Sequence, residues 1–148
     1  MATFQAADIN TKPLQAGGEG NAVIYDGTAN PTAGASGDII RPTKIPAGTR
    51  VTGVRIVNDD LDSNAGPTIA AKVGYSYVDG SAAPAGADTA FAAAGDTVLQ
   101  SPGNKELRFY PITIEKDAFL EIVLTAAAAT FAPGKVCGIV SGASLGAK

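Results

Sequence analysis

The chain of 148 residues has no histidine, no tryptophan and a single cysteine, Cys137. Histidine is the side chain that most often transfers protons near neutral pH, so its absence removes the usual general base and the usual nitrogen ligand for metals. One cysteine can form neither an intrachain disulfide nor a cysteine zinc site. We expect Cys137, within the strand-like run KVCGIV, to act as a small buried hydrophobe.

Long apolar runs and clusters of basic residues are also missing. No apolar run approaches the roughly 20 residues that span a bilayer, and no charged start precedes an apolar core, so we expect neither a membrane span nor a secretory signal. The formal net charge is −3, whereas nucleic-acid binding needs a concentrated cationic surface. We therefore expect no membrane and no nucleic acid among the partners.

Apolar residues are numerous, but many of them have small side chains. It amounts to 45% of the chain, and 28 of these residues are alanine, whereas valine, isoleucine, leucine and phenylalanine together number only 33. Burying alanine removes little area from water, and this content of large aliphatic and aromatic residues is near the lower limit for a globular core. The composition indicates a domain that gains stability from neighbouring subunits. The alternative is a monomeric sandwich with an alanine-rich surface.

Alternation of apolar and polar residues predicts short, half-buried antiparallel strands separated by Pro/Gly and Asn/Asp turns. This pattern predicts an all-β fold, an antiparallel β-sandwich, most simply an eight-stranded jelly roll. We expect a core of Val54, Ile56, Ile69, Val73, Tyr75, Leu120, Ile122 and Leu124, with Thr52 on the same face as Val54 and Arg55 on the other. The expected strands are Asn21–Asp26, Asp38–Thr43, Arg50–Asn58, Thr68–Val78, Asp96–Ser101, Lys105–Ile114, Ala118–Thr125 and Gly134–Ser141.

The remaining segments carry other signals. Residues 1–20 show no periodicity and end in Gly17, Gly18 and Gly20, so we predict an extended N-terminal arm over 1–20 and a single β-sandwich domain over 21–148. Asp88 or Thr89 could cap a short helix over Ala90–Ala94, closed by Gly95 in the left-handed conformation. The run Ala126–Ala129 fits either another helical turn or a tight loop. Pro42 and Pro111 predict sheet edges or bulges.

Oxygen-bearing side chains are densest between residues 58 and 64, where the sequence places Asn58, Asp59, Asp60, Asp62 and Asn64. An EF-hand loop counted from Asp60 would need glycine and glutamate at Ala65 and Ala71, so that motif is excluded. Two interpretations stay open. One is a looser calcium site; the favoured one is a turn in which Asx side chains bind their own backbone.

No combination of residues predicts catalysis. A serine–lysine pair has no defined spacing, and Gly17, Gly18 and Gly20 lack the Lys-Ser/Thr of a phosphate-binding loop. Three glutamates, Glu106, Glu115 and Glu121, could supply a carboxylate pair, but we expect them on solvated strand faces. Four aromatic residues, Tyr75, Tyr77, Phe109 and Tyr110, could line a sugar-binding face, although core packing is the favoured interpretation. We predict no catalytic residue, no cofactor-binding residue and no metal ligand.

The central segment contains four features in a fixed order: the strand Gly37–Arg41, the turn Lys44–Gly48 leading into Val51–Val57, the acidic turn Asn58–Asn64, and the strand ending in Val73-Gly74-Tyr75-Ser76. In the order of these features it resembles the small jelly-roll head decoration (cement) proteins of tailed bacteriophages. It covers about forty residues.

This resemblance implies a viral structural protein without enzymatic activity or cofactor. Such a protein binds the outer surface of the phage head in the virion, after synthesis in the host bacterial cytoplasm. Its partners would be the major capsid protein, whose adjacent subunits it bridges, and itself, as a dimer or trimer. The alternative is a trimeric adhesion or carbohydrate-binding module of a phage tail or fibre. An enzyme of unfamiliar type is a third hypothesis, which requires a deep polar pocket with perturbed pKa values.

Overall fold

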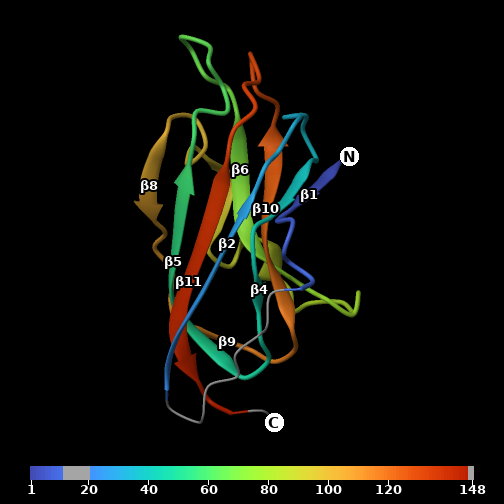
Figure 1. Cartoon of the computed structure of the whole chain (residues 1–148), viewed down its shortest axis with the longest axis vertical. Coiled ribbons are helices and arrows are strands. Elements are labelled where there is room, and N and C mark those ends of the chain that lie inside the picture. The colour runs from blue at the N-terminus through green and yellow to red at the C-terminus, as the bar shows by residue number, and fades with distance from the viewer. Residues whose placement is uncertain (12–20, 147–148) are drawn as a thin grey trace.

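A computed structural model describes residues 1–11 and 21–146 of the chain. Two β-sheets face each other and form a sandwich, as predicted, and the strands run along its long axis (Figure 1). The only helix of the described residues is the short 3₁₀ turn η1. The elements are β1 (Thr3–Gln5), β2 (Ala22–Ala29), β3 (Ile39–Arg41), β4 (Lys44–Ile45), β5 (Thr49–Asn58), β6 (Ala70–Tyr77), η1 (Ala87–Thr89), β7 (Ala92–Asp96), β8 (Gly103–Glu106), β9 (Ile112–Ile114), β10 (Ala118–Ala126) and β11 (Val136–Ser144).

The first sheet has the strand order β1-β3-β10-β6-β7. The short strand β4 also pairs with β10, at a different part of β10 from β3. The second sheet has the order β2-β11-β5-β8, and β9 pairs with the other end of β5. All pairs are antiparallel except β1 with β3, which is parallel. Between β2 and β6 the chain passes from the second sheet to the first at β3 and β4, back to the second at β5, and again to the first at β6, so each sheet contains strands that are distant in sequence.

The described residues form eleven strands rather than the eight predicted. The increase has three sources: β1 and β4 lie outside the predicted strands, and the predicted strand Lys105–Ile114 is interrupted. Pro42 separates β3 from β4, and Pro111 lies between β8 and β9, as expected for a residue that cannot donate to the ladder. If each interrupted pair counts as one strand, eight strands remain beside β1, four in each sheet. The eight-stranded jelly roll stays a prediction.

The core between the sheets contains the eight residues that the alternation predicted, and each is at most 8% exposed. Along β6 the buried side chains are Ile69, Ala71, Val73, Tyr75 and Tyr77, as expected. Thr52 was placed on the wrong face. The register of β5 against β11 shifts at this residue, because Gly53 pairs with Ser141 and Val51 pairs with Gly142. This bulge leaves Thr52 exposed while Val51 and Val54 both point into the core.

The alanine-rich segment after β6 differs from the prediction. Ala92–Asp96 is strand β7, which pairs with β6, and the helical turn lies earlier, at Ala87–Thr89. Gly95 does have a positive φ of 91°, but within a strand irregularity rather than at a helix end. The predicted strand Asp96–Ser101 contributes only Asp96, since residues 97–101 form a turn. Residues 127–129 form a loop, the second of the two alternatives.

The first residues of the chain lie along the outer edge of the first sheet. The Ala2 N–H donates to Asp38 Oδ1 at 2.7 Å, and the Ala6 N–H donates to the Arg41 carbonyl at 3.1 Å. Ala6 and Ile9 are buried against Phe119 in a small cluster of their own, separate from the main core. Gly17, Gly18 and Gly20 lie outside the described residues, and the division into an arm and a domain at residue 20 stays a prediction.

Cys137 is half-buried rather than buried. It lies on β11, the central strand of the second sheet, between Thr28 of β2 and Val57 of β5. Its neighbours Val136 and Gly138 are buried, so Cys137 is on the outer face of the sheet. Within residues 1–11 and 21–146, no helix is long and apolar enough to cross a membrane.

Candidate functional site

The acidic turn between β5 and β6 is organised by one inward-facing carboxylate, Asp62, which is 1% exposed. Its Oδ2 accepts hydrogen bonds from the N–H groups of Thr68 and Ile69, at 2.7 and 3.1 Å. Two further N–H groups come from the β10–β11 loop: Ala129 donates to Oδ2 and Thr130 to Oδ1, both at 2.9 Å. Asp62 therefore joins two loops that are more than sixty residues apart in sequence.

The four N–H donors determine the protonation state of Asp62. Burial raises the pKa of this carboxyl group, but the N–H groups of Thr130, Ala129, Thr68 and Ile69 outweigh burial and hold the pKa well below its ordinary value. Asp62 is thus an ionised group whose lone pairs are already used within the chain.

The other side chains of the turn also bind backbone groups. Asp60 Oδ1 accepts from the Asp62 N–H at 3.0 Å, and Asn64 Oδ1 accepts from the Gly66 N–H at 2.9 Å, both two residues ahead. Asp59 Oδ2 accepts from the Lys135 N–H at 2.8 Å. The contacts of Asp60 and Asn64 fit the Asx-turn interpretation, whereas Asp59 binds the backbone of a distant loop. Among the residues that the structure describes, no three histidine, cysteine, aspartate or glutamate side chains come together to hold a metal ion.

Asn58 has one unsatisfied atom. Its Nδ2 donates to the carbonyls of Asp59 and Ser101, at 2.8 and 3.0 Å, while the buried Oδ1 has no hydrogen-bond partner. The residue is 6% exposed. An amide oxygen in this position is commonly satisfied by an ordered water.

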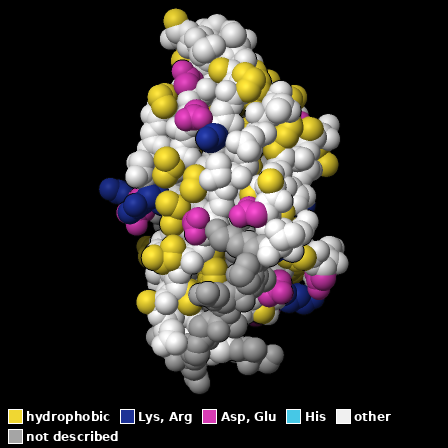
Figure 2. Space-filling view, in the orientation of Figure 1, with side chains coloured by type: hydrophobic (Ala, Val, Ile, Leu, Met, Phe, Trp, Pro, Cys, Tyr) yellow, Lys and Arg dark blue, Asp and Glu magenta, His cyan; other side chains and the backbone are white. Residues whose placement is uncertain are grey.

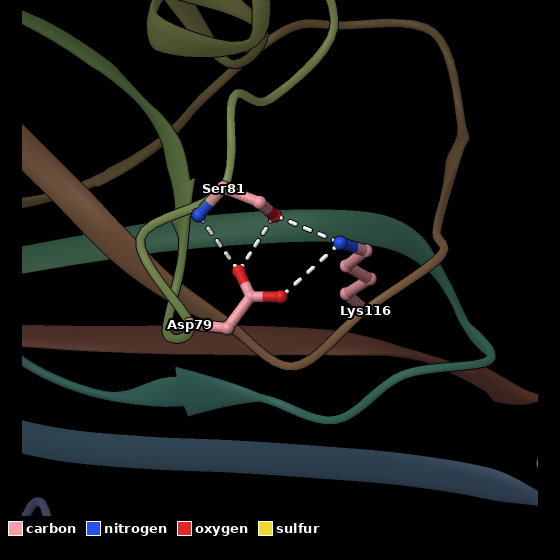
Figure 3. Close-up of polar contacts among 3 residues, drawn as sticks. All are labelled: Asp79, Ser81 and Lys116. Carbon is pink, nitrogen blue, oxygen red and sulfur yellow. Dashed lines mark hydrogen bonds and ion pairs between the residues drawn. The ribbon is translucent and has the colours of Figure 1, made fainter.

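A second polar cluster joins the loop after β6 to the loop before β10 (Figure 3). Asp79 Oδ1 accepts from the Ser81 N–H at 2.9 Å and from the Ser81 hydroxyl at 2.6 Å. Lys116 Nζ donates to Asp79 Oδ2 at 3.1 Å and to Ser81 Oγ at 2.9 Å, and it lies 5.4 Å from the centre of the Tyr77 ring. No sequence pattern predicts this cluster, because the serine and the lysine are 35 residues apart.

This serine–lysine contact is not arranged for nucleophilic catalysis. A lysine acts as a general base only when it is neutral, and here it is paired with a carboxylate. The Ser81 hydroxyl and N–H, followed by Lys116, lower the pKa of Asp79 to about 2, so this carboxylate is ionised near neutral pH. The side chains of Lys116 and Asp79 are 52% and 54% exposed, so the cluster is open to water.

The three glutamates lie on separate elements. Glu121 of β10 is bound by Arg41, at 2.8 Å, and by the Ser76 hydroxyl, at 2.6 Å, on the outer face of the first sheet. Glu106 is exposed on β8, and Glu115 is exposed just after β9. Each carboxylate therefore has its own environment.

The aromatic residues belong mainly to the core. Tyr75 and Tyr77 are 8% and 7% exposed, with ring centres 6.0 Å apart. Phe91 continues the cluster, 6.2 Å from Tyr75 and 4.8 Å from Phe109. Burial, followed by the nearby Tyr77 and Glu115, raises the pKa of Tyr75. Of the four aromatic residues considered from the sequence, only Tyr110, at 90%, is fully exposed.

One face of the molecule is shown in space-filling form in Figure 2. In the view of Figure 2, hydrophobic side chains are scattered among uncharged atoms, with only isolated acidic and basic groups between them. The large hydrophobic side chains most exposed among the described residues lie on different elements; they are Met1, Ile24, Val78, Tyr110 and Leu145.

Comparison with known proteins connects this fold to phage capsids. No protein-family model matches the sequence, and no curated protein matches it. Among solved structures, a chain of the Ralstonia phage GP4 capsid is 27% identical with a TM-score of 0.70, over 99% of this chain and 100% of that one. A chain of the cyanophage Pam1 capsid asymmetric unit is also 27% identical with a TM-score of 0.70, over 90% and 94%. This chain is similar to phage capsid proteins.

A third similar chain belongs to the acid-stable capsid of Helicobacter pylori bacteriophage KHP30. It is 13% identical with a TM-score of 0.56, over 87% of this chain and 92% of that one. At this identity the similarity concerns the fold alone. The fold of this chain is therefore similar to that of a chain in this capsid.

Proposed function

We propose that this chain is a capsid decoration, or cement, protein. It would bind the outer surface of a phage head and bridge neighbouring subunits of the major capsid protein. The observation that carries the proposal is the end-to-end similarity to a chain of the GP4 capsid, which covers 99% of one chain and all of the other. The similarity therefore extends over the whole of that capsid chain.

The structure of the chain supports a structural role rather than a chemical one. Its polar side chains mainly fasten loops: Asp62 and Asp79 each join two loops at the ends of strands β6 and β10. Rigid loops suit a subunit that binds through many small contacts, because less conformational entropy is lost on binding. Several weak contacts to adjacent shell subunits then act together as one strong attachment.

The partners and location follow from this role. We propose the major capsid protein and further copies of the chain, as a dimer or trimer, as partners, and the outer virion surface as the location. The net charge of −3 does not favour binding to nucleic acid. The chain would act without a cofactor and without catalysis.

Two alanine-rich segments, Ser81–Gly95 and Ala126–Gly134, are the proposed contact regions, because small side chains let backbones approach closely. Ala93 is exposed on β7 and suits a test of this idea. Ala128 packs against the core, so a charged residue there would disturb the fold itself. The exposed Ala127 is the better position in the second segment.

The N-terminal residues are the third proposed contact, as an arm that strengthens attachment. In this structure residues 2–9 cover Phe119 and donate to Asp38. We expect a chain without residues 2–20 to keep its sandwich, because among the described residues of this segment only Phe4, which is partly buried, packs against the main core. We expect it to bind heads more weakly.

The test uses phage heads assembled without the chain, to which the purified full-length protein is added. We expect saturable binding, and greater retention of DNA on heating or osmotic shock than in undecorated heads. Ala93→Glu and Ala127→Glu should weaken binding at least about tenfold, as for substitutions at the centre of an interface. The matched control is Ala22→Glu, an exposed alanine at the start of β2, which should bind normally.

Circular dichroism verifies that each variant is folded. Equal DNA retention with and without the protein would rule out the cement role. Binding to a panel of cell-surface glycans, in place of heads, would support the adhesion module.

A further inference from the structure

The turn after β6 contains a peptide bond of a chemically fragile type, Asp79–Gly80. Aspartate followed by glycine is prone to rearrangement, because glycine has no side chain to shield its nitrogen. That nitrogen attacks Cγ of the aspartate, water leaves, and a five-membered succinimide forms. Water then opens the ring at either carbonyl, and one product is isoaspartate, in which the main chain runs through the side-chain carboxyl group. The reaction needs no enzyme and no other reactant.

The structure holds both reacting groups, the Gly80 nitrogen and the Asp79 carboxylate, in hydrogen bonds that oppose ring closure. The Gly80 N–H donates to the Tyr77 carbonyl at 3.2 Å, and Gly80 has a φ of 73°. Asp79 Oδ1 is bound to the N–H and the hydroxyl of Ser81, while Oδ2 is bound to Lys116 (Figure 3). The turn is also fixed to the neighbouring loop, because the Val78 N–H donates to the Asp117 carbonyl at 2.9 Å.

We propose that Ser81 and Lys116 protect the Asp79–Gly80 bond, and that this bond is the first site of isoaspartate formation when either contact is lost. The carboxylate must rotate towards the Gly80 nitrogen before the ring can close, and rotation breaks its bonds to both residues. An ionised carboxylate is also a poor electrophile, and the contacts that lower the pKa of Asp79 to about 2 keep it ionised. Water has access to the turn, since the Asp79 side chain is 54% exposed.

The second Asp-Gly bond in the chain, Asp26–Gly27, offers an internal reference. Both of its residues lie within β2 and pair with Ile139 and Gly138 of β11. Gly27 is packed so closely against the Pro42 carbonyl that no Cβ would fit. The sheet itself fixes this bond, so its rate of rearrangement should not depend on Ser81 or Lys116.

Rearrangement at Asp79 would have a structural consequence. The main chain would gain one carbon atom before Gly80, and the bond between the two loops would be lost. The loop that follows leads to η1, which covers the first sheet at Gly74.

The experiment ages the folded full-length protein at neutral pH and 37 °C, and measures isoaspartate at Asp79 and Asp26 by peptide mass spectrometry with electron-transfer fragmentation. Lys116→Gln and Ser81→Ala should each accelerate formation at Asp79 about two- to five-fold, the factor expected when an exposed charged contact is lost. The rate at Asp26 should not change. The matched control is Lys105→Gln, which removes a lysine of similar exposure, 47% against 52%, whose Nζ lies 3.0 Å from Asp96 Oδ1.

Each outcome decides the matter. Faster formation at Asp79 in Lys116→Gln and Ser81→Ala, but not in Lys105→Gln, supports the proposal. Equal rates in the wild type and all variants would overturn it, because the contacts would then protect nothing. Acceleration by all three variants at both bonds would also overturn it, since general loosening of the fold would be the cause. Urea-unfolded protein, in which both bonds react, gives the upper limit of the rate.

Discussion

Two carboxylates, Asp62 and Asp79, each connect two loops, at opposite ends of the paired strands β6 and β10. Asp62 precedes β6 and binds the loop that follows β10, whereas Asp79 follows β6 and binds the loop that precedes β10. Asp62 is 1% exposed and accepts only from backbone N–H groups. The side chain of Asp79 is 54% exposed, and it is bound mainly by other side chains.

This difference in exposure determines how much each carboxylate should contribute to the stability of the fold. A buried carboxylate leaves its donors without any partner when it is removed, because water cannot replace it. An exposed carboxylate leaves donors that water satisfies at once, and its ion pair is weakened by salt. Asp62 should therefore hold the fold together, whereas Asp79 should matter mainly for the local order of its turn.

The largest effect is expected for Asp62→Ala. The substitution leaves four N–H groups in two loops without a hydrogen-bond acceptor, so the melting temperature should fall by about 5–15 °C. Thermal unfolding followed by circular dichroism measures this. Asp59→Ala, which removes one exposed carboxylate that accepts from Lys135, is the matched control and should change the melting temperature little. Similar losses in both variants would contradict the buried role of Asp62.

Acid should produce the next effect. The pKa of Asp62 is lowered in the folded chain, so its contribution is complete above the unfolded carboxyl pKa of about 4 and is lost as the pH falls below it. Asp79, with a pKa lowered to about 2, adds a smaller loss in the same direction. The melting temperature of the wild type should therefore decrease below about pH 4. The decrease should be shallower in Asp62→Ala, and parallel profiles would show that other carboxylates dominate.

The smallest effect is expected for Asp79→Ala. The pair with Lys116 is exposed on both sides, so the melting temperature should fall by less than about 2 °C, and less still in high salt. Thermal unfolding at low and high ionic strength tests this. A decrease as large as that of Asp62→Ala would remove the distinction between the two carboxylates.

Strong alternation made the sandwich and much of its core predictable. The faces of β6 and β10 follow from Ile69–Tyr77 and from Leu120, Ile122 and Leu124, because a half-buried strand leaves this pattern in sequence. Strand β7 was missed because its sequence, AAAGD, favours helix locally. Pairing with β6 overrides that preference, since the Phe91 N–H donates to the Val73 carbonyl at 2.9 Å and anchors the segment to the sheet.

The polar clusters were less predictable. The acidic turn looks uniform in sequence, and nothing local distinguishes Asp62 from Asp59 or Asp60. Asp62 alone faces inward because the loop at Ala129 and Thr130 presents its N–H groups there. Partners so distant in sequence cannot be read from one chain without its fold. The bulge at Thr52 was missed for the same reason, since only the register against β11 reveals it.

The position of Cys137 allows this thiol to be used as a probe of the outer face of the second sheet. It is the one thiol of the sequence, half-buried on the outer face of the central strand of the second sheet. A thiol-reactive dye would therefore label the chain at one known point, without any substitution. The rate of labelling would then report whether another molecule shields that face.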